Sequence, residues 1–173
     1  AGIEADMENP GFKHIILQPT PGGGLSEVTA SYDSAYGEIV SNWGYEDHDT
    51  FVYDAKIPAN TTATVYLPTE GNAIQVNGKD AADLTIEADG IRYVDTQDGK
   101  AVFEAVAGQF TFKTKVERYY QISVTDGDSR YPSTLLVDGP AQSLPYNQQV
   151  KYGDSITLEF QPVNQVDSCF SSI

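Results

Sequence analysis

The chain has 173 residues, of which 40% are hydrophobic, and its formal net charge is −15. This composition predicts a folded core rather than disorder, and the acidic balance argues against nucleic acid or an anionic membrane as partner, because either needs a basic face. Cys169 is the only cysteine, so an internal disulfide is excluded.

An alternation of apolar and polar residues recurs along the chain and predicts β-strands, because successive side chains of a strand point to opposite faces. In chain order we expect strands over residues 12–18, 27–32, 38–43, 50–57, 62–67, 91–95, 100–106, 109–113, 119–125, 135–137 and 155–161. The expected apolar faces carry Ile39, Ser41 and Trp43; Phe51, Tyr53, Ala55 and Ile57; and Ala63, Val65 and Leu67. Gln97-Asp98-Gly99 predicts a hairpin turn, because Asp-Gly tolerates positive φ.

Short strands punctuated by Gly, Pro and Asn predict an all-β fold, an antiparallel β-sandwich of the jelly-roll kind, over residues 12–115. Residues 116–173 contain three expected strands, too few to bury a full core. We expect this segment to be a small β-rich addition, either a tail packed on the sandwich or a truncated second module. No helix-period stripe, membrane span or signal peptide is predicted. The missing initiator Met leads us to expect a fragment of a longer chain.

Three motifs carry a family resemblance. The first is Pro10-Gly11-Phe12-Lys13-His14, the second runs from Ser31 to Trp43 around Tyr32-Asp33-Ser34 and Tyr36-Gly37, and the third is Pro58-Ala59-Asn60-Thr61-Thr62-Ala63. With the closing segment Gly108-Gln109-Phe110-Thr111-Phe112, they resemble the C-terminal β-domain of bacterial α-L-rhamnosidases, glycoside hydrolase family 78. The likeness covers about residues 1–113. Ala35 stands where the family commonly has Pro.

The resemblance implies a noncatalytic C-terminal accessory domain. The family cleaves terminal α-L-rhamnose with inversion, and its acid and base carboxylates lie on an (α/α)6 barrel that precedes the Gly-Phe-Lys segment. No catalytic residue, metal or cofactor is therefore expected in this chain. Residues 1–11 are expected to be the linker from that absent catalytic domain, and the barrel of the same parent chain is the expected partner. The resemblance also implies that the protein is periplasmic or extracellular.

Two alternative functions stay open. Trp43, Tyr45 and Tyr53 are candidates for a sugar-stacking platform of a carbohydrate-binding module, since β-sandwiches are also common lectin scaffolds; otherwise they pack the core. The segment from Tyr152 to Leu158 is similar to strand entries of bacterial surface repeats and suggests a surface interaction module.

Two possible metal-binding segments have incomplete ligand patterns. His14 and His48 lack a third ligand at metal-binding spacing, so we expect no metal site. The segment Asp126-Gly127-Asp128-Ser129 lacks the remaining oxygen ligands of a calcium loop and is expected to be a hairpin turn.

Overall fold

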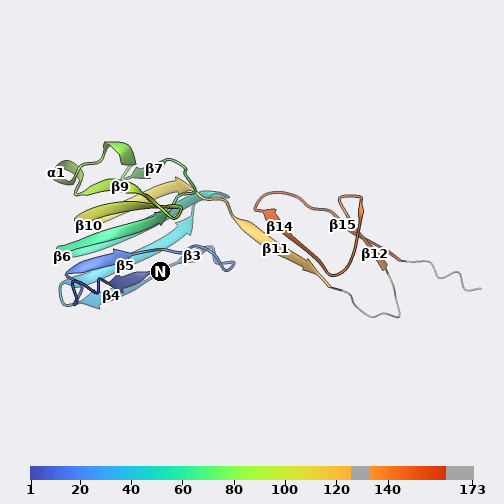
Figure 1. The fold of residues 1–173 in the computed structure, drawn as a ribbon, viewed down its shortest axis with the longest axis horizontal. Coiled ribbons are helices and arrows are strands. Elements are labelled where there is room, and N and C mark those ends of the chain that lie inside the picture. The colour runs from blue at the N-terminus through green and yellow to red at the C-terminus, as the bar shows by residue number, and fades with distance from the viewer. Residues whose placement is uncertain (126–132, 163–173) are drawn as a thin grey trace, which may run out of the picture. The chain divides into compact units, whose positions relative to one another are not determined.

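The computed structural model of the chain describes residues 1–125 and 133–162, which divide between two compact units, Ala1–Glu117 and Arg118–Ile173. Figure 1 labels the strands of each unit. The expected turn at 126–129 and Cys169 lie outside the described residues. No described helix is long and apolar enough to cross a membrane.

Unit 1 is built almost entirely of strands. Its elements are β1 (Ile3–Ala5), β2 (His14–Leu17), β3 (Glu27–Val28), β4 (Ser31–Ser34), β5 (Gly37–Tyr45), β6 (Thr50–Pro68), β7 (Ile74–Val76), β8 (Lys79–Asp80), a 3₁₀ turn (Ala81–Asp83), α1 (Ile86–Asp89), β9 (Ile91–Gln97) and β10 (Lys100–Lys115). All pairings are antiparallel except β2 with β6, which is parallel. The predicted all-β sandwich is confirmed, with one parallel pair added.

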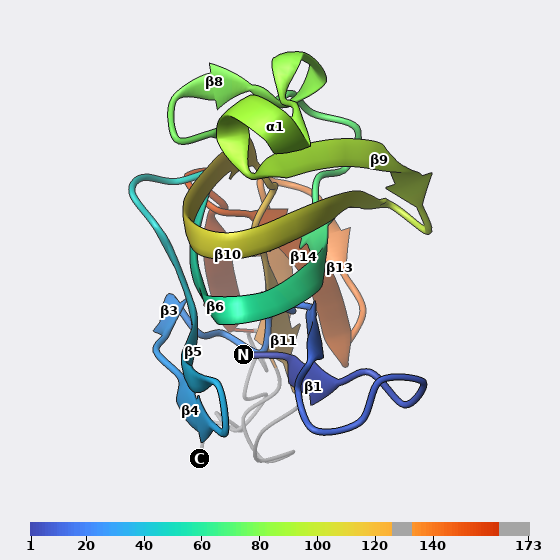
Figure 2. The ribbon, with the colours of Figure 1, turned by 90° about the vertical axis from the view of Figure 1, so that its left-hand side faces the viewer.

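The two longest strands, β6 and β10, belong to both layers of the sandwich. The first half of β6 pairs with β5 and with the second half of β10, and β7 continues this layer. The second half of β6 pairs with β2 and with the first half of β10, and β9 closes that layer. Figure 2 shows both strands curving from one layer to the other. Phe103 of one layer packs on Phe112 of the other, with ring centroids 5.2 Å apart.

The bend of β6 lies where the sequence predicted an end of one strand and the start of another. Residues 50–57 and 62–67, predicted as separate strands, are halves of the single strand β6. Asn60 takes the left-handed conformation at φ 61°, and the Thr61 hydroxyl donates to the Pro58 carbonyl at 2.7 Å. Asn tolerates this conformation better than most residues, so the chain turns here without ending the strand. The irregular register between Val106 and Gly108 bends β10 at the matching place.

The predicted apolar faces are confirmed by burial. Ile39, Phe51, Tyr53, Val65 and Leu67 are fully buried. The predicted hairpin is also present: Asp98 and Gly99 both have positive φ between β9 and β10, as a two-residue primed turn requires.

Residues 1–11, expected to be a linker, contain a strand of the sheet. Ile3, Glu4 and Ala5 pair with Leu17, Ile16 and Ile15. Next to this strand, the Gly2 carbonyl accepts from Gln18 N at 2.8 Å. A Cβ at Gly2 would lie 1.9 Å from the Gln18 carbonyl oxygen, so only glycine fits this approach. The early residues therefore belong to the folded unit.

The turn between β5 and β6 is organised by one carboxylate. Asp47 accepts from the Thr50 hydroxyl at 2.9 Å and from the backbone N–H groups of Thr50 and Asp49. The Thr50 side-chain bond, followed by these backbone bonds, holds the pKa of Asp47 far below its ordinary value of 3.8.

We expect Asp47 to make the melting temperature of unit 1 fall as the pH is lowered below about 4. A depressed folded pKa contributes stability that is complete above the unfolded value near 3.8 and is lost as the pH falls through the lower folded value. Thermal melts of the wild type and of Asp47→Asn, which keeps an acceptor oxygen but does not titrate, should differ in slope below about pH 4. Equal slopes would show that this carboxylate does not carry the effect.

Unit 2 forms two small sheets among its described residues. β11 (Tyr119–Val124) pairs with β14 (Tyr146–Lys151), and β12 (Ser133–Val137) lies between β13 (Ala141–Gln142) and β15 (Leu158–Pro162). Leu135 and Val137 are its buried hydrophobic residues in the described part. The segment from Tyr152 to Leu158, which is similar to strand entries of surface repeats, is a turn and an extended stretch that ends at the first residue of β15.

Candidate functional site

Two of the three aromatic residues predicted as a sugar platform are buried, and the third is partly buried. Tyr53 is fully buried and Trp43 is 4% exposed, while Tyr45 is partly buried against the core. The Trp43 ring contacts Tyr45 and Phe51 at centroid distances of 6.2 and 6.0 Å. Strand alternation points Trp43 and Tyr53 inward, so their faces are covered by protein and cannot stack on a sugar.

Tyr53 belongs to a buried polar pair. Its hydroxyl lies 3.0 Å from the Ser41 hydroxyl, which donates to the Ala1 carbonyl at 2.6 Å. Burial raises the pKa of Tyr53 well above its ordinary 10.0, because a phenolate loses its hydration there. Trp43 has no such partner: its indole N–H is buried and makes no hydrogen bond within the described part of the chain. Both residues have structural roles.

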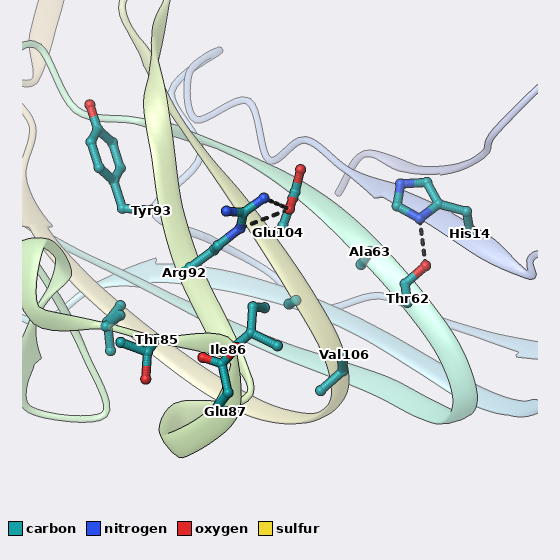
Figure 3. Close-up of a pocket in the computed structure, with 12 residues that line it drawn as sticks. His14, Thr62, Ala63, Thr85, Ile86, Glu87, Arg92, Tyr93, Glu104 and Val106 are labelled. Atoms are coloured by element: carbon teal, nitrogen blue, oxygen red, sulfur yellow. Dashed lines mark hydrogen bonds and ion pairs between the residues drawn. The ribbon is translucent and has the colours of Figure 1, made fainter.

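An open groove of about 660 Å³ lies elsewhere on unit 1 and is the best candidate site (Figure 3). Five elements or their flanks line it. The lining residues are His14 from β2, Thr62 and Ala63 from β6, Leu84 to Glu87 from the start of α1, Arg92 and Tyr93 from β9, and Glu104 to Val106 from β10.

An ion pair stands on one wall of the groove. Arg92 donates from Nε and Nη2 to the same Glu104 oxygen, at 2.9 and 2.6 Å. The two residues are cross-strand partners in β9 and β10, and both side chains are about half exposed. An exposed pair adds little stability. Its interest is chemical, because a planar guanidinium fork next to a carboxylate can donate to and accept from neighbouring hydroxyl groups.

His14 lies across the groove from this pair in Figure 3. Its two ring nitrogens are 2.7 Å from the Thr62 hydroxyl and 2.9 Å from the Thr64 hydroxyl. These bonds fix the ring plane against β6. His14, the first residue of β2, is therefore a polar group that is held in place on the groove wall.

A short helix and one tyrosine complete the groove. Thr85 caps α1 by accepting from Ala88 N, and Asp89 accepts from Thr85 N and Lys79. The Lys79 bond, then the Thr85 bond, lower the pKa of Asp89. Tyr93 packs edge-on against Phe103 at 5.7 Å and is 38% exposed. The groove thus combines a polar wall, an apolar floor at Ala63 and Ala105, and one exposed ring.

Among residues 1–125 and 133–162, no group of three or more His, Cys, Asp or Glu side chains could hold a metal ion.

Part of unit 1 is similar to a known family. Residues 2–82 match the family described as the bacterial alpha-L-rhamnosidase C-terminal domain. This part of the chain is therefore similar to a bacterial α-L-rhamnosidase C-terminal domain. All three resemblance motifs lie inside the matched range, and the groove joins His14 and Thr62 from that range to β9 and β10 beyond it.

Curated relatives of this chain are much longer proteins. An alpha-L-rhamnosidase of Streptomyces avermitilis is 29% identical over 102 residues, which are 59% of this chain and 9% of that protein. One from Formosa agariphila is 24% identical over 106 residues, 61% of this chain and 11% of the relative. The chain therefore spans about a tenth of the length of these relatives and corresponds to an accessory domain within them.

A solved structure shows the same fold. The alpha-L-rhamnosidase from "Dictyoglumus thermophilum" superposes with a TM-score of 0.54 at 19% identity, over 66% of this chain and 12% of that one. At this identity the likeness concerns the fold alone.

Sequence reasoning missed Arg92, Tyr93 and Glu104. The Asp98-Gly99 turn predicts the pairing of β9 with β10, and with it a polar cross-strand pair. A regular ladder from that turn, however, would place Tyr93 opposite Glu104. The ladder shifts between Val102 and Phe103, so that Phe103 faces Tyr93 and Glu104 faces Arg92. This irregularity creates the ion pair on the groove wall.

Proposed function

We propose that this chain is a noncatalytic accessory domain of an inverting α-L-rhamnosidase, held against the catalytic (α/α)6 barrel of the same polypeptide. The observation that carries the proposal is the match of residues 2–82 to the family's C-terminal domain, within relatives about ten times longer. Inversion requires two carboxyl groups about 6.5–9.5 Å apart around an attacking water. In this proposal they belong to the barrel, and the parent enzyme is periplasmic or extracellular.

Activity of the isolated chain tests the noncatalytic role. The pure 173-residue chain should not hydrolyse p-nitrophenyl α-L-rhamnoside. The parent enzyme should, and NMR of its first-formed sugar should show the inverted anomer. Deleting this domain from the parent should lower the parent's melting temperature or solubility. Turnover by the isolated chain that disappears in Glu104→Gln would overturn the proposal.

A second candidate is carbohydrate binding in the groove, which the ion pair and the exposed Tyr93 ring favour. Arg92 and Glu104 offer donors and acceptors to vicinal hydroxyls, and the Tyr93 ring offers an apolar face to sugar C–H groups. These features lie on β9 and β10, away from the residues that sequence had suggested.

Calorimetric titration with rhamnose and rhamnogalacturonan fragments tests this candidate. We expect saturable heat that is lost in Arg92→Ala. Lys56→Ala is the matched control, because it removes an ion pair of similar exposure, with Glu38 at 2.8 Å, on β5 and β6. No saturable heat, or heat that survives Arg92→Ala, would exclude the groove as a sugar site.

A further inference from the structure

Three segments that are far apart in sequence meet at one end of unit 1. They are the loop before β2, the turn between β4 and β5, and the bend of β6. The Phe12 ring lies 4.6 Å from the Tyr32 ring, and the Lys13 ammonium lies 5.2 Å from the centre of the Tyr36 ring. Lys13 also donates to the Asn60 carbonyl. We call Phe12, Lys13, Tyr32 and Tyr36 the aromatic tip.

The backbone under the aromatic tip is held in one shape. Phe12 itself has a positive φ of 63°, which is costly for a bulky residue and persists only where its surroundings enforce it. Thr62 N donates to the Lys13 carbonyl at 3.2 Å, which ties the loop to β6. The Ser34 hydroxyl donates to the Gly37 carbonyl at 2.7 Å and accepts from Tyr36 N. The rings are thus presented by a rigid support.

The two tyrosines at this support are exposed. Tyr32 is 46% and Tyr36 41% exposed, and neither hydroxyl has a hydrogen-bond partner in the described part of the chain. Each therefore presents an apolar ring and an available hydroxyl, a combination enriched in the buried centres of protein interfaces. Met7, in the same loop as Phe12, is 96% exposed.

We propose that the aromatic tip is the surface through which this domain contacts the catalytic barrel of its own polypeptide. This rests on the function proposed above. In curated relatives about nine tenths of the chain lies outside the matched segment, which supplies a tethered protein partner. The occupant is a preformed surface of that chain, apolar at its centre with acceptors for the tyrosine hydroxyls. Rigid, preorganised aromatic rings reduce the entropy cost of such docking.

Oxidative footprinting tests the contact without any substitution. Hydroxyl-radical labelling of Tyr32 and Tyr36, read by mass spectrometry, is compared between the 173-residue chain and the parent enzyme. We expect several-fold lower labelling of both tyrosines in the parent. Leu25, which is 55% exposed in the loop before β3, is the internal control and should label equally in both.

A double substitution tests the energetic role. Tyr32→Ser with Tyr36→Ser should lower the melting temperature of the parent enzyme on the order of 5 °C more than it lowers that of the isolated chain. Leu25→Ser should shift both proteins equally. Tyr36→Glu alone should act in the same direction, because it puts a charge into a buried contact.

Three outcomes would overturn the inference. Equal labelling in both proteins, while deletion of the domain still destabilises the parent, would remove the aromatic tip as interface and leave the proposed function standing. Deletion without effect on the parent would reject the proposed function itself. Concentration-dependent dimerisation of the isolated chain that protects Tyr36 would assign the surface to a second copy instead.

Discussion

Replacing Trp43 by Ala should lower the free energy of unfolding of unit 1 by about 3–5 kcal/mol. The indole is 4% exposed and packs between Tyr45 and Phe51, so its removal leaves a cavity that the rigid sheet cannot close. Domains of this size are stable by only about 5–15 kcal/mol. Urea unfolding followed by far-ultraviolet circular dichroism measures the loss without relying on indole fluorescence.

Trp43→Phe is the matched comparison for this prediction. It keeps most of the buried surface and removes the indole N–H, which is buried without a partner among the described residues. Because an unpaired buried donor costs about 1–3 kcal/mol, we expect Trp43→Phe to be much less destabilising than Trp43→Ala. If Trp43→Ala instead folds with unchanged stability and loses sugar binding, the buried position of this ring is wrong.

Phe112→Ala should cost a similar amount, about 3–5 kcal/mol. Phe112 is fully buried on β10 and joins the two layers, since its ring lies 5.6 Å from Tyr53 and 5.2 Å from Phe103. Its loss removes contacts on both sides of the core. Urea titration of the whole chain should show a lower midpoint with an unchanged slope.

The neighbouring residue supplies the control for Phe112. Thr111 lies on the opposite face of β10, where its hydroxyl donates to Asp54 at 2.6 Å. Thr111→Ala should cost about 0.5–1.5 kcal/mol, the usual value of one hydrogen bond. Equal costs at positions 111 and 112 would contradict the assignment of Phe112 to the interior.

The substitutions proposed above distinguish aromatic residues that stabilise the fold from exposed ones that are candidates for binding. Trp43, Tyr53 and Phe112 stabilise the sandwich from inside, and their substitution acts on folding. Tyr32, Tyr36 and Tyr93 are exposed, and their substitution tests docking or ligand binding in a chain that remains folded.

Local pattern was enough for several of the strands, their inward faces, the Asp98-Gly99 hairpin and the resemblance to the rhamnosidase domain. Alternation of side chains is a property of each strand alone, so Ile39, Tyr53 and Val65 could be assigned to the core from their spacing. Only the tertiary structure decided that β6 and β10 bend between layers, that a shifted ladder sets Arg92 opposite Glu104, and that Phe12, Tyr32 and Tyr36 meet at one end. These features depend on long-range pairing and on backbone irregularities at Asn60 and near Val102, which no single stretch of sequence specifies.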